Sequence, residues 1–539
     1  NKLPEPYSEF EGKIIREIHI TTLDPFGYSV TDTATQTQNI LSNAGNGTHV
    51  KSQRITIRNL LLIHKNDPFD SLLVKESERL IRSQSYVHEV SFHVVYVGAK
   101  SDSVDIYIRE LDTWSINPEV SASTESYTVD VTDKNFLGFG HRFQNVFSRD
   151  YIAGTNSFYT NYSIPNIRNT FISSTLHYGI DGQGNYNRSL NIDRPFFSPF
   201  AKWAAGVFII QQFQYNSIHV NDSVSVQQDI KYTVEDYWAG NSRQVFKGNT
   251  EDARTTNLIL AARYLRVRYQ ERPIELYDPL HNYSNEDFPM AAVGISTRKY
   301  VQDKFIFKYG PTEDVPVGQV YGITGGYQVR NNIGRIYAGA RFSFGNYTQW
   351  GYMSYNFEYG TFFRSSHAEQ GVFTAGVNYF TDLFEIGNWK FRQFIKPQLT
   401  LGINRFSYEN ITINNENGLR GFSTSSLAGT KKVVVTLQTQ SYAPWNVLGF
   451  RFGPYLIYSL GILGNDGTGF RNNHMYSQFG FGVLIKNEYL VFNYFQISVA
   501  FYPVIPGDGE NIFKINSNTT TDIGFRDFII GKPGTAAYQ

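Results

Sequence analysis

The chain has 539 residues and carries 48 basic and 48 acidic side chains, so its formal net charge is zero. This balance excludes the strongly basic surface with which nucleic-acid-binding proteins contact phosphates. The sequence has no cysteine, which excludes a disulfide scaffold, a thiol nucleophile and a cysteine-ligated zinc site. With a mean hydropathy of −0.33 and no run of about 18 apolar residues, the chain is not a helical membrane protein.

Aromatic residues make up 16% of the chain, and 45 glycines accompany them. This composition fits two classes of protein: a large soluble β protein, or an outer-membrane β-barrel whose strands alternate lipid-facing apolar and lumen-facing polar residues. The first ten residues contain no apolar core of the kind found in a signal peptide. The chain is therefore expected to be either a mature exported protein or one that is not exported.

Residues 10–113 are expected to form a small α+β domain. A strand pattern comes first, and a helical pattern then ends before Pro68, because proline disfavours helix in the residue before it. Asp70 is expected to cap a second helix. Two strands with period-two alternation follow. The predicted order is strand, helix, helix, strand, strand.

Residues 114–539 contain no helical pattern. They repeat segments of about ten residues with period-two alternation, separated by turns rich in glycine, asparagine and aspartate. For example, Ile336 and Phe342 fall on one face of a segment, and Tyr337 and Arg341 fall on the other. The polar faces carry few charge pairs, and aromatic residues gather near strand ends. These features favour a membrane-spanning barrel over a soluble sandwich.

The length of this region predicts the size of the barrel. At roughly 20 to 27 residues for a strand and its share of the loops, residues 115–539 give about 16 to 20 strands, and the number should be even. The fold class is therefore mainly β, and we expect an antiparallel transmembrane barrel of about 16 strands. A barrel of this size has a water-filled lumen unless something fills it.

Residues 406–430 are rich in asparagine, serine and threonine and separate two clear strand patterns. A loop of this length is unusual in a compact protein unless it is functional or folds back on the protein. It contains the motif Gly418, Leu419, Arg420, Gly421, Phe422. Gly421 permits a tight turn, and the guanidinium of Arg420 binds carboxylates or carbonyls. Two interpretations have equal weight: Arg420 holds the loop inside the lumen, or the motif is a turn on the outer surface.

The predicted domain order and this motif together resemble a known superfamily. Its members are outer-membrane protein insertases and translocases, including BamA, TamA and the two-partner-secretion transporters. The helical part of residues 66–87 is similar to that of a POTRA domain, and residues 133–143 (DKNFLGFGHRF) are similar to a motif near the start of the family barrel. The resemblance covers nearly the whole chain. It implies a POTRA-like periplasmic domain at 10–113 and a barrel at 114–539 with an inward-folded loop at 406–430.

The resemblance also implies a role for Arg420. In the family, this arginine contacts a wall motif on the second strand after the loop, which corresponds here to Ser459 and Gly461. Ser459 stands where the family has an aspartate, and alternation places it on the lumen side. Two partners for Arg420 therefore stay open: the Ser459 hydroxyl, or another lumen carboxylate such as Glu358.

The last segment with a strand pattern, residues 525–532, is expected to close the barrel. Its candidate seam residues are Phe525, Asp527, Phe528, Gly531 and Pro533. Proline cannot donate a hydrogen bond to a strand ladder, so this strand is expected to pair weakly and to open sideways or accept a client strand. The alternative is that Gly531 and Pro533 simply end the strand in a tail.

The resemblance implies a protein of the bacterial outer membrane that inserts or translocates polypeptides by strand pairing. The expected partners are outer-membrane lipids and unfolded client polypeptides, with periplasmic or lipoprotein accessory subunits as an option. No nucleic acid, metal or cofactor is expected. No enzymatic activity is expected either, because the sequence lacks a nucleophile elbow, a zinc-protease motif, a P-loop and a dinucleotide fingerprint. The alternatives are a passive porin-like channel and a structural subunit of a larger outer-membrane complex.

Overall fold

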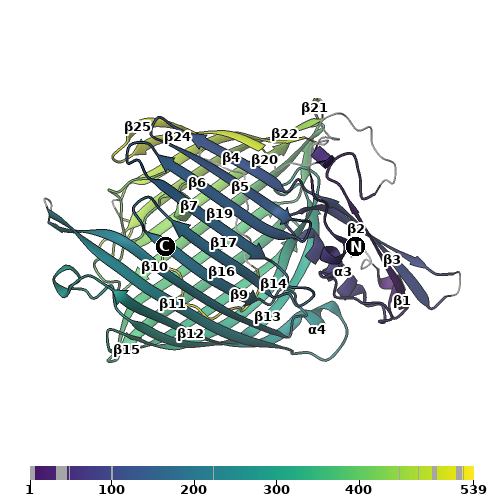
Figure 1. The fold of residues 1–539 in the computed structure, drawn as a ribbon, viewed down its shortest axis with the longest axis horizontal. Helices are drawn as coiled ribbons and strands as arrows, with labels where there is room; N and C mark the ends of the chain where they lie inside the picture. The colour runs from purple at the N-terminus through teal and green to yellow at the C-terminus, as the bar shows by residue number, and fades with distance from the viewer. Residues whose placement is uncertain are drawn as a thin grey trace.

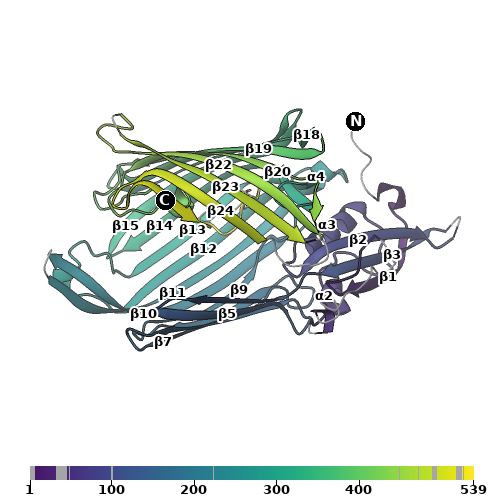
Figure 2. The ribbon, with the colours of Figure 1, turned by 90° about the horizontal axis from the view of Figure 1, so that it is seen from above.

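The computed structural model describes residues 7–31, 45–47, 49–98, 101–221, 224–447, 449–471, 473–487, 495–516, 525 and 527–539. These residues form a small N-terminal domain and a large cylinder of strands (Figure 1). The N-terminal domain lies at one end of the cylinder, and the C-terminus lies within the outline of the cylinder in two perpendicular views (Figure 1, Figure 2). We call the end that carries the N-terminal domain the near end, and the opposite end the far end.

The N-terminal domain has a three-stranded sheet in the order β1-β3-β2. The central strand β3 runs parallel to β1 and antiparallel to β2. The elements of the domain are η1 (Ser8–Phe10), β1 (Ile14–Leu23), α2 (Arg54–Arg58), α3 (Ser71–Arg82), β2 (Val87–Tyr96) and β3 (Ser103–Asp112). Strand, helix, helix, strand, strand is the order that the sequence predicts for this region.

Helix α3 begins where the sequence predicts it. The carboxylate of its N-cap residue Asp70 accepts hydrogen bonds from the backbone N–H groups of Leu72 and Leu73. These N–H groups lie in the first turn and have no carbonyl acceptor within the helix, so the Asp70 carboxylate supplies their acceptor. Val74 and Ile81 are fully buried in the core between the helix and the sheet. Among the described residues, no helix is both long enough and apolar enough to cross a membrane.

The remaining strands form one sheet whose order closes on itself, running from β10 through β25 and β4 back to β9. Its strands are β4 (Ile116–Ala122), β5 (Ser126–Phe136), β6 (His141–Asp150), β7 (Asn156–Ile164), β8 (Ser173–Ile180), β9 (Tyr186–Arg194), β10 (Trp203–Asn221), β11 (Val224–Gln244), β12 (Thr256–Glu271), β13 (Glu286–Lys304), β14 (Thr312–Arg330), β15 (Ile333–Thr348), β16 (Gly351–Arg364), β17 (His367–Thr381), β18 (Phe384–Ile386), β19 (Trp389–Ile403), β20 (Lys431–Tyr442), β21 (Asn446–Val447), β22 (Phe450–Gly464), β23 (Met475–Asn487), β24 (Phe495–Ile505) and β25 (Gly509–Ile515). The sequence predicts no helix in this region, but one short helix, α4 (Glu251–Thr255), and two single 3-10 turns, η2 (Glu275–Tyr277) and η3 (Asn415–Asn417), lie in its loops.

The number of strands in the ring lies at the upper end of the range that the sequence predicts. Among the described residues, β18 continues β17 along β19, and β21 continues β20 along β22, so the twenty-two segments make up twenty strand positions. Twenty lies within the range of about 16 to 20 that the length predicts and above the expected barrel of about 16. Turns such as 331–332 and 365–366 need only two residues, both with positive φ. Short turns of this kind leave much of the chain for strands, which places the ring at the upper end of that range.

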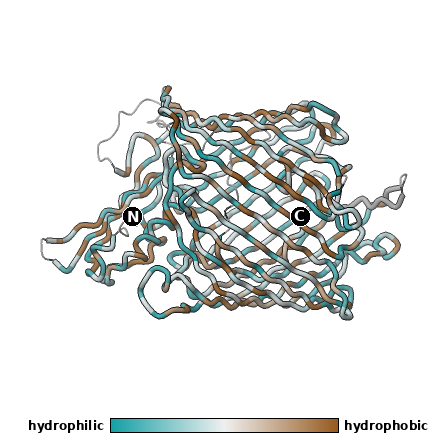
Figure 3. The backbone as a smooth tube through the Cα atoms, turned by 180° about the vertical axis from the view of Figure 1, so that it is seen from behind, coloured by the Kyte–Doolittle hydropathy of each residue, from teal (hydrophilic) through white to brown (hydrophobic). Residues whose placement is uncertain are grey.

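Side chains alternate between two environments along the strands, as the sequence predicts. In β15, Ile336 and Phe344 are exposed on the outer face, whereas Tyr337 and Ser343 are buried on the inner face. Figure 3 shows hydrophobic and hydrophilic residues alternating along the strands. The ring therefore has a largely apolar exterior and a polar interior.

Candidate functional site in the lumen

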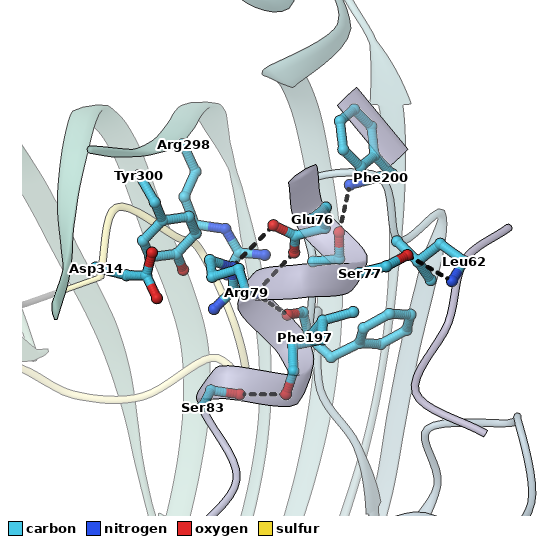
Figure 4. A network of polar contacts seen from close by, with 12 residues as sticks. Leu62, Glu76, Ser77, Arg79, Ser83, Phe197, Phe200, Arg298, Tyr300 and Asp314 are labelled. Atoms are coloured by element: carbon cyan, nitrogen blue, oxygen red, sulfur yellow. Dashed lines mark hydrogen bonds and ion pairs between the residues drawn. The ribbon is translucent and has the colours of Figure 1, made fainter. Parts of the chain in front are cut away.

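Helix α3 fastens the N-terminal domain to the near end of the cylinder (Figure 4). The Arg82 guanidinium donates two hydrogen bonds to the carboxylate of Asp314 on β14, at 2.9 and 3.0 Å. Arg79 forms a bidentate pair with Glu76, at 2.8 and 2.7 Å, and lies 4.1 Å over the ring of Tyr300 on β13. These charge-assisted contacts are largely shielded from solvent, so they hold the domain across the near end.

A second joint connects the domain to the first strands of the cylinder. The Asp112 carboxylate, at the end of β3, is hydrogen-bonded to His49 Nε2 at 2.8 Å and to the Ser52 backbone N–H at 2.7 Å. The Ser52 hydroxyl accepts a hydrogen bond from the Asn135 side chain at 2.9 Å. Asn135 belongs to the segment 133–143 that is similar to the start of the family barrel. In this protein that segment therefore builds the joint between the two regions.

The joint also buries an additional carboxylate. Glu110 is fully buried and lies near Asp112 on the same strand. Burial raises the pKa of Glu110 well above its ordinary value, and the nearby Asp112 charge raises it further. The joint therefore favours the protonated form of Glu110.

Between β19 and β20 the chain folds into the interior of the cylinder. Leu419 and Phe422, from the motif 418–422, are fully buried. They pack in one apolar cluster with inward-facing wall residues, including Val434 of β20 and Tyr502 of β24. The motif thus lies against the inner wall and not on the outer surface.

The wall holds the tip of this loop through backbone carbonyls. The Arg420 carbonyl accepts hydrogen bonds from the Gln478 side chain, at 2.9 Å, and from the Tyr502 hydroxyl. The Gly421 carbonyl accepts one from Lys514 of β25 at 2.9 Å. Gly421 has a φ of +73°, which glycine adopts without strain. The three donors were not predicted, because alternation gives only their inward direction and not the loop that they meet.

Of the two wall residues implied by the resemblance, Gly461 lies directly beneath the loop. A methyl group on Gly461 would lie 3.4 Å from Leu419 Cγ, in ordinary van der Waals contact with the loop. Ser459 is buried on the same face, and its hydroxyl is hydrogen-bonded to β20 at 3.1 Å. Tyr455 of β22 is also buried and faces inward.

Residues 525–532 do not form the closing strand that the sequence predicts. The described part of this segment contains no strand, and β25 lies beside β4 to close the ring. The ring of Phe525 packs among aromatic rings at the near end. The Tyr538 hydroxyl donates a hydrogen bond to the Thr430 carbonyl at the far end, at 3.1 Å. The C-terminal tail (residues 525 and 527–539) therefore runs through the lumen from the near end to the far end.

The residue pattern of the tail explains the incorrect prediction. Phe528 and Ile530 alternate like strand residues, but both are buried against the inner wall, in a cluster with residues of β10 to β14. Pro533 has no N–H group to donate, and Gly531 weakens a strand, so the segment is unsuited to a ladder. The second interpretation of the sequence, that these residues end in a tail, is closer to the structure.

Two ion pairs also connect the tail to the wall. Asp527 pairs with Arg298 of β13 at 2.8 Å. Lys532 pairs at 2.9 Å with Asp236 of β11, which is also paired with Arg263 of β12 at 2.7 Å. All three wall residues face inward. The alternating sequence pattern predicts that these side chains face inward. It does not predict that their partners come from the end of the chain.

The loop and the tail leave a cavity of about 330 Å³ between themselves and the wall. Glu358, the carboxylate considered as a partner for Arg420, lines this cavity together with Glu416, Lys432 and Phe528. In the part of the chain that the structure describes, no group of three or more histidine, aspartate or glutamate residues is placed to hold a metal ion. The lumen is thus lined by charged residues and holds two peptide segments of the chain itself.

The sequence matches no family model and no curated protein. The structure is similar to CdiB from Acinetobacter baumannii, with a TM-score of 0.40 and 10% identity over 94% of this chain and 73% of that chain. It is similar to CdiB from Escherichia coli, with a TM-score of 0.43 and 8% identity over 94% of this chain and 75% of that chain. It is also similar to BamA from Haemophilus ducreyi lacking POTRA domains 1–3, with a TM-score of 0.35 and 13% identity over 93% of this chain and 84% of that chain.

The chain resembles BamA and CdiB in fold. At identities of 13% or below, the similarity concerns the arrangement of strands and does not extend to particular residues.

Proposed function

We propose that this protein is a β-barrel of the bacterial outer membrane that inserts or secretes client polypeptides, with a POTRA-like domain in the periplasm. One observation carries the proposal. A closed ring of strands presents apolar side chains outward, and its polar interior already binds two peptide segments. Apolar side chains on the outer face are stable in contact with lipid, and a polar interior that binds peptide segments can also bind a client polypeptide.

Tryptophans at the near end support the membrane placement. Trp203 begins β10, Trp350 lies in the turn between β15 and β16, and Trp445 follows β20; all three side chains are exposed. The near end is also where the N-terminal domain docks. Tryptophan is enriched where a membrane meets water, because its ring is apolar and its N–H is polar. The near end is therefore proposed to lie at the periplasmic interface.

The N-terminal domain offers an edge for a client strand. Among the described residues β2 pairs with β3 alone, and Val95 and Tyr96 near its end are exposed. An extended peptide can add to such an edge through main-chain hydrogen bonds. This edge and the filled lumen favour a polypeptide-handling protein over a passive porin-like channel, since wide conduction needs an open lumen.

Depletion of the protein, followed by proteomics of the outer membrane and the cell surface, tests the proposal. We expect a defined set of outer-membrane or surface proteins to be lost and to return when the wild-type chain is supplied. Purified protein in a planar bilayer should give a small, flickering current. An unchanged proteome together with a large, steady current would instead establish a passive channel. An unchanged proteome with a stoichiometric co-purifying partner would establish a structural subunit.

A pair of matched variants sharpens this experiment. Tyr96→Lys places a charge on the edge strand β2, whereas Tyr107→Lys places one on the central strand β3, and the two tyrosines are similarly exposed, at 41% and 43%. A charged edge opposes strand addition. We therefore expect Tyr96→Lys to reproduce the depletion and Tyr107→Lys to behave like the wild type. Equal behaviour of the two variants would exclude this edge as the client site.

A further inference from the structure

Besides the buried side chains of Phe528 and Ile530, the first half of the C-terminal tail is held through its backbone. Arg341 of β15 donates hydrogen bonds to the carbonyls of Asp527 and Ile529, at 3.4 and 3.3 Å. The Ser296 hydroxyl of β13 donates to the carbonyl of Phe528. Three consecutive carbonyls are thus bound by two wall side chains. Because every residue of a polypeptide has a carbonyl, these contacts do not depend on the sequence of the tail.

The second half of the tail is held in the same way. Arg263 of β12 donates a hydrogen bond to the Pro533 carbonyl at 2.9 Å. The Tyr337 hydroxyl of β15 accepts one from the Ala536 N–H at 2.8 Å. The backbone contacts therefore extend from residue 527 to residue 536, along one stretch of the inner wall.

Glycines on the inner face make room for the side chains of the tail. A methyl group on Gly322 of β14 would lie 3.2 Å from Ile530 Cδ1, and one on Gly360 of β16 would lie 3.0 Å from Ala536 Cβ. Both glycines belong to the inward-facing register of their strands. A larger wall residue at either position would crowd the tail. The wall thus provides both backbone partners and space for side chains.

The tail crosses the lumen in an extended conformation. The ring of Phe525 lies 5.4 Å from the ring of Tyr352, near the start of β16, and Ala536 lies beside Gly360 of the same strand. The strand advances about 27 Å between Tyr352 and Gly360. A helix from Phe525 to Ala536 would span only about 16 Å, whereas an extended chain of the same length spans about 36 Å. Only an extended tail covers this distance.

We infer that the inner wall of β11 to β16 is a binding track for an extended polypeptide, and that the C-terminal tail is its exchangeable occupant. Arg263, Ser296, Tyr337 and Arg341 bind the backbone of whichever chain lies there. A second polypeptide in extended conformation takes the place of the tail. The inference rests on the proposed function in one respect: the client polypeptide is the second chain that replaces the tail.

A reversible tether tests whether the tail leaves its track. The chain has no cysteine, and a Cβ at Gly360 would lie 3.0 Å from Ala536 Cβ, slightly closer than the roughly 3.5–4.5 Å of a disulfide, and 2.2 Å from the Tyr337 hydroxyl, so the tail and this hydroxyl have to move apart to accommodate the bridge. We use the double variant Gly360→Cys/Ala536→Cys, with the two single variants as controls for folding. In a planar bilayer, the oxidised double variant should lose the flickering openings, and reduction should restore them. Equal currents in the oxidised and reduced forms would overturn the inference.

Peptide exchange provides a second measurement that does not depend on current. The variant Asp527→Ala/Lys532→Ala weakens the tail and leaves the wall unchanged. A fluorescent synthetic peptide with the sequence of residues 527–539 should bind this variant, and it should not bind the oxidised tethered protein. Adding Arg341→Ala to the weakened-tail variant should reduce peptide affinity about tenfold, because two backbone hydrogen bonds to a charged group are lost.

The outcomes separate this inference from the proposed function. Absence of peptide binding to the weakened-tail variant, or equal binding to the tethered protein, would show that the tail is a permanent part of the wall. Either result leaves the depletion experiment unaffected. Conversely, an unchanged proteome after depletion would overturn the client function, while peptide binding to the purified protein would still establish the track.

Discussion

The loop of residues 404–430 and the C-terminal tail both lie in the lumen, but the wall binds them differently. The loop inserts apolar side chains, Leu419 and Phe422, into a fully buried cluster. The tail also buries Phe528 and Ile530 against the wall, but it is bound in addition through backbone carbonyls and through ion pairs whose tail members, Asp527 and Lys532, are about 40% exposed. The loop thus depends mainly on apolar burial, whereas the tail combines apolar burial with half-exposed polar contacts that can be exchanged for contacts with another chain.

The largest expected effect concerns the loop. Phe422→Ala should reduce the free energy of unfolding by about 3–5 kcal/mol, because it leaves a cavity in a closed apolar cluster. Thermal unfolding of the purified protein in detergent measures this loss. Phe479→Ala, at an exposed position on the outer face of β23, is the matched control and should change little. Equal losses for the two variants would mean that the loop is not part of the core.

The tail variant Asp527→Ala/Lys532→Ala should have a smaller effect on stability, about 1–2 kcal/mol, because both pairs are partly exposed to solvent. Its effect on planar-bilayer current should be larger than that of Phe422→Ala at temperatures where both proteins are folded. The loop variant should therefore have the larger effect on stability, and the tail variant should have the larger effect on current. A stability loss as large as that of Phe422→Ala would place the tail in the core as well.

Arg420→Ala should reduce the free energy of unfolding by about 1 kcal/mol and slow barrel assembly. The effect is smaller than that of Phe422→Ala because the carbonyl of residue 420, which Gln478 and Tyr502 bind, is retained in the variant. Heat-modifiability on gels and the rate of assembly are the measurements. Arg420→Lys keeps the charge and should be intermediate. Full stability and normal assembly of Arg420→Ala would remove the proposed role of its side chain.

Tyr502→Phe should have the smallest effect, about 0.5–1 kcal/mol, because it removes one hydroxyl donor and keeps the buried ring. Tyr321→Phe, exposed on the outer face of β14, is the control and should be neutral in detergent. Unfolding measured on the two variants under the same conditions isolates the hydrogen bond to the loop. No difference between them would mean that the apolar cluster alone holds the loop.

The register of individual strands could be predicted because it depends on local pattern. In β15 the predicted outward Ile336 and inward Tyr337 occupy those faces in the structure. The capping of α3 by Asp70 was likewise predictable, since a cap involves only the next few residues. The exact number of strands could be predicted only as a range, because it depends on turn lengths; with turns of two residues, as at 331–332 and 365–366, the ring reaches the upper end of the expected range of about 16 to 20.

The lumen contacts could not be predicted from the sequence. Residues 509–515 and 525–532 both alternate, and only the first segment joins the ring. The second packs Ile530 over Gly322 and Phe528 against β13 and β15, which are far away in the sequence. Alternation specifies which face of a segment is apolar, but it does not specify whether that face meets lipid or the inner wall.

The sequence by itself therefore determined the class of fold, the order of elements in the N-terminal domain and the direction of side chains along each strand. These properties follow from the period of the apolar pattern and from local capping. Only the tertiary structure decided which segments enter the lumen, which strand closes the ring and which wall residues meet the loop and the tail. Those choices depend on contacts between residues that are hundreds of positions apart, and such contacts leave no periodic signal in either partner.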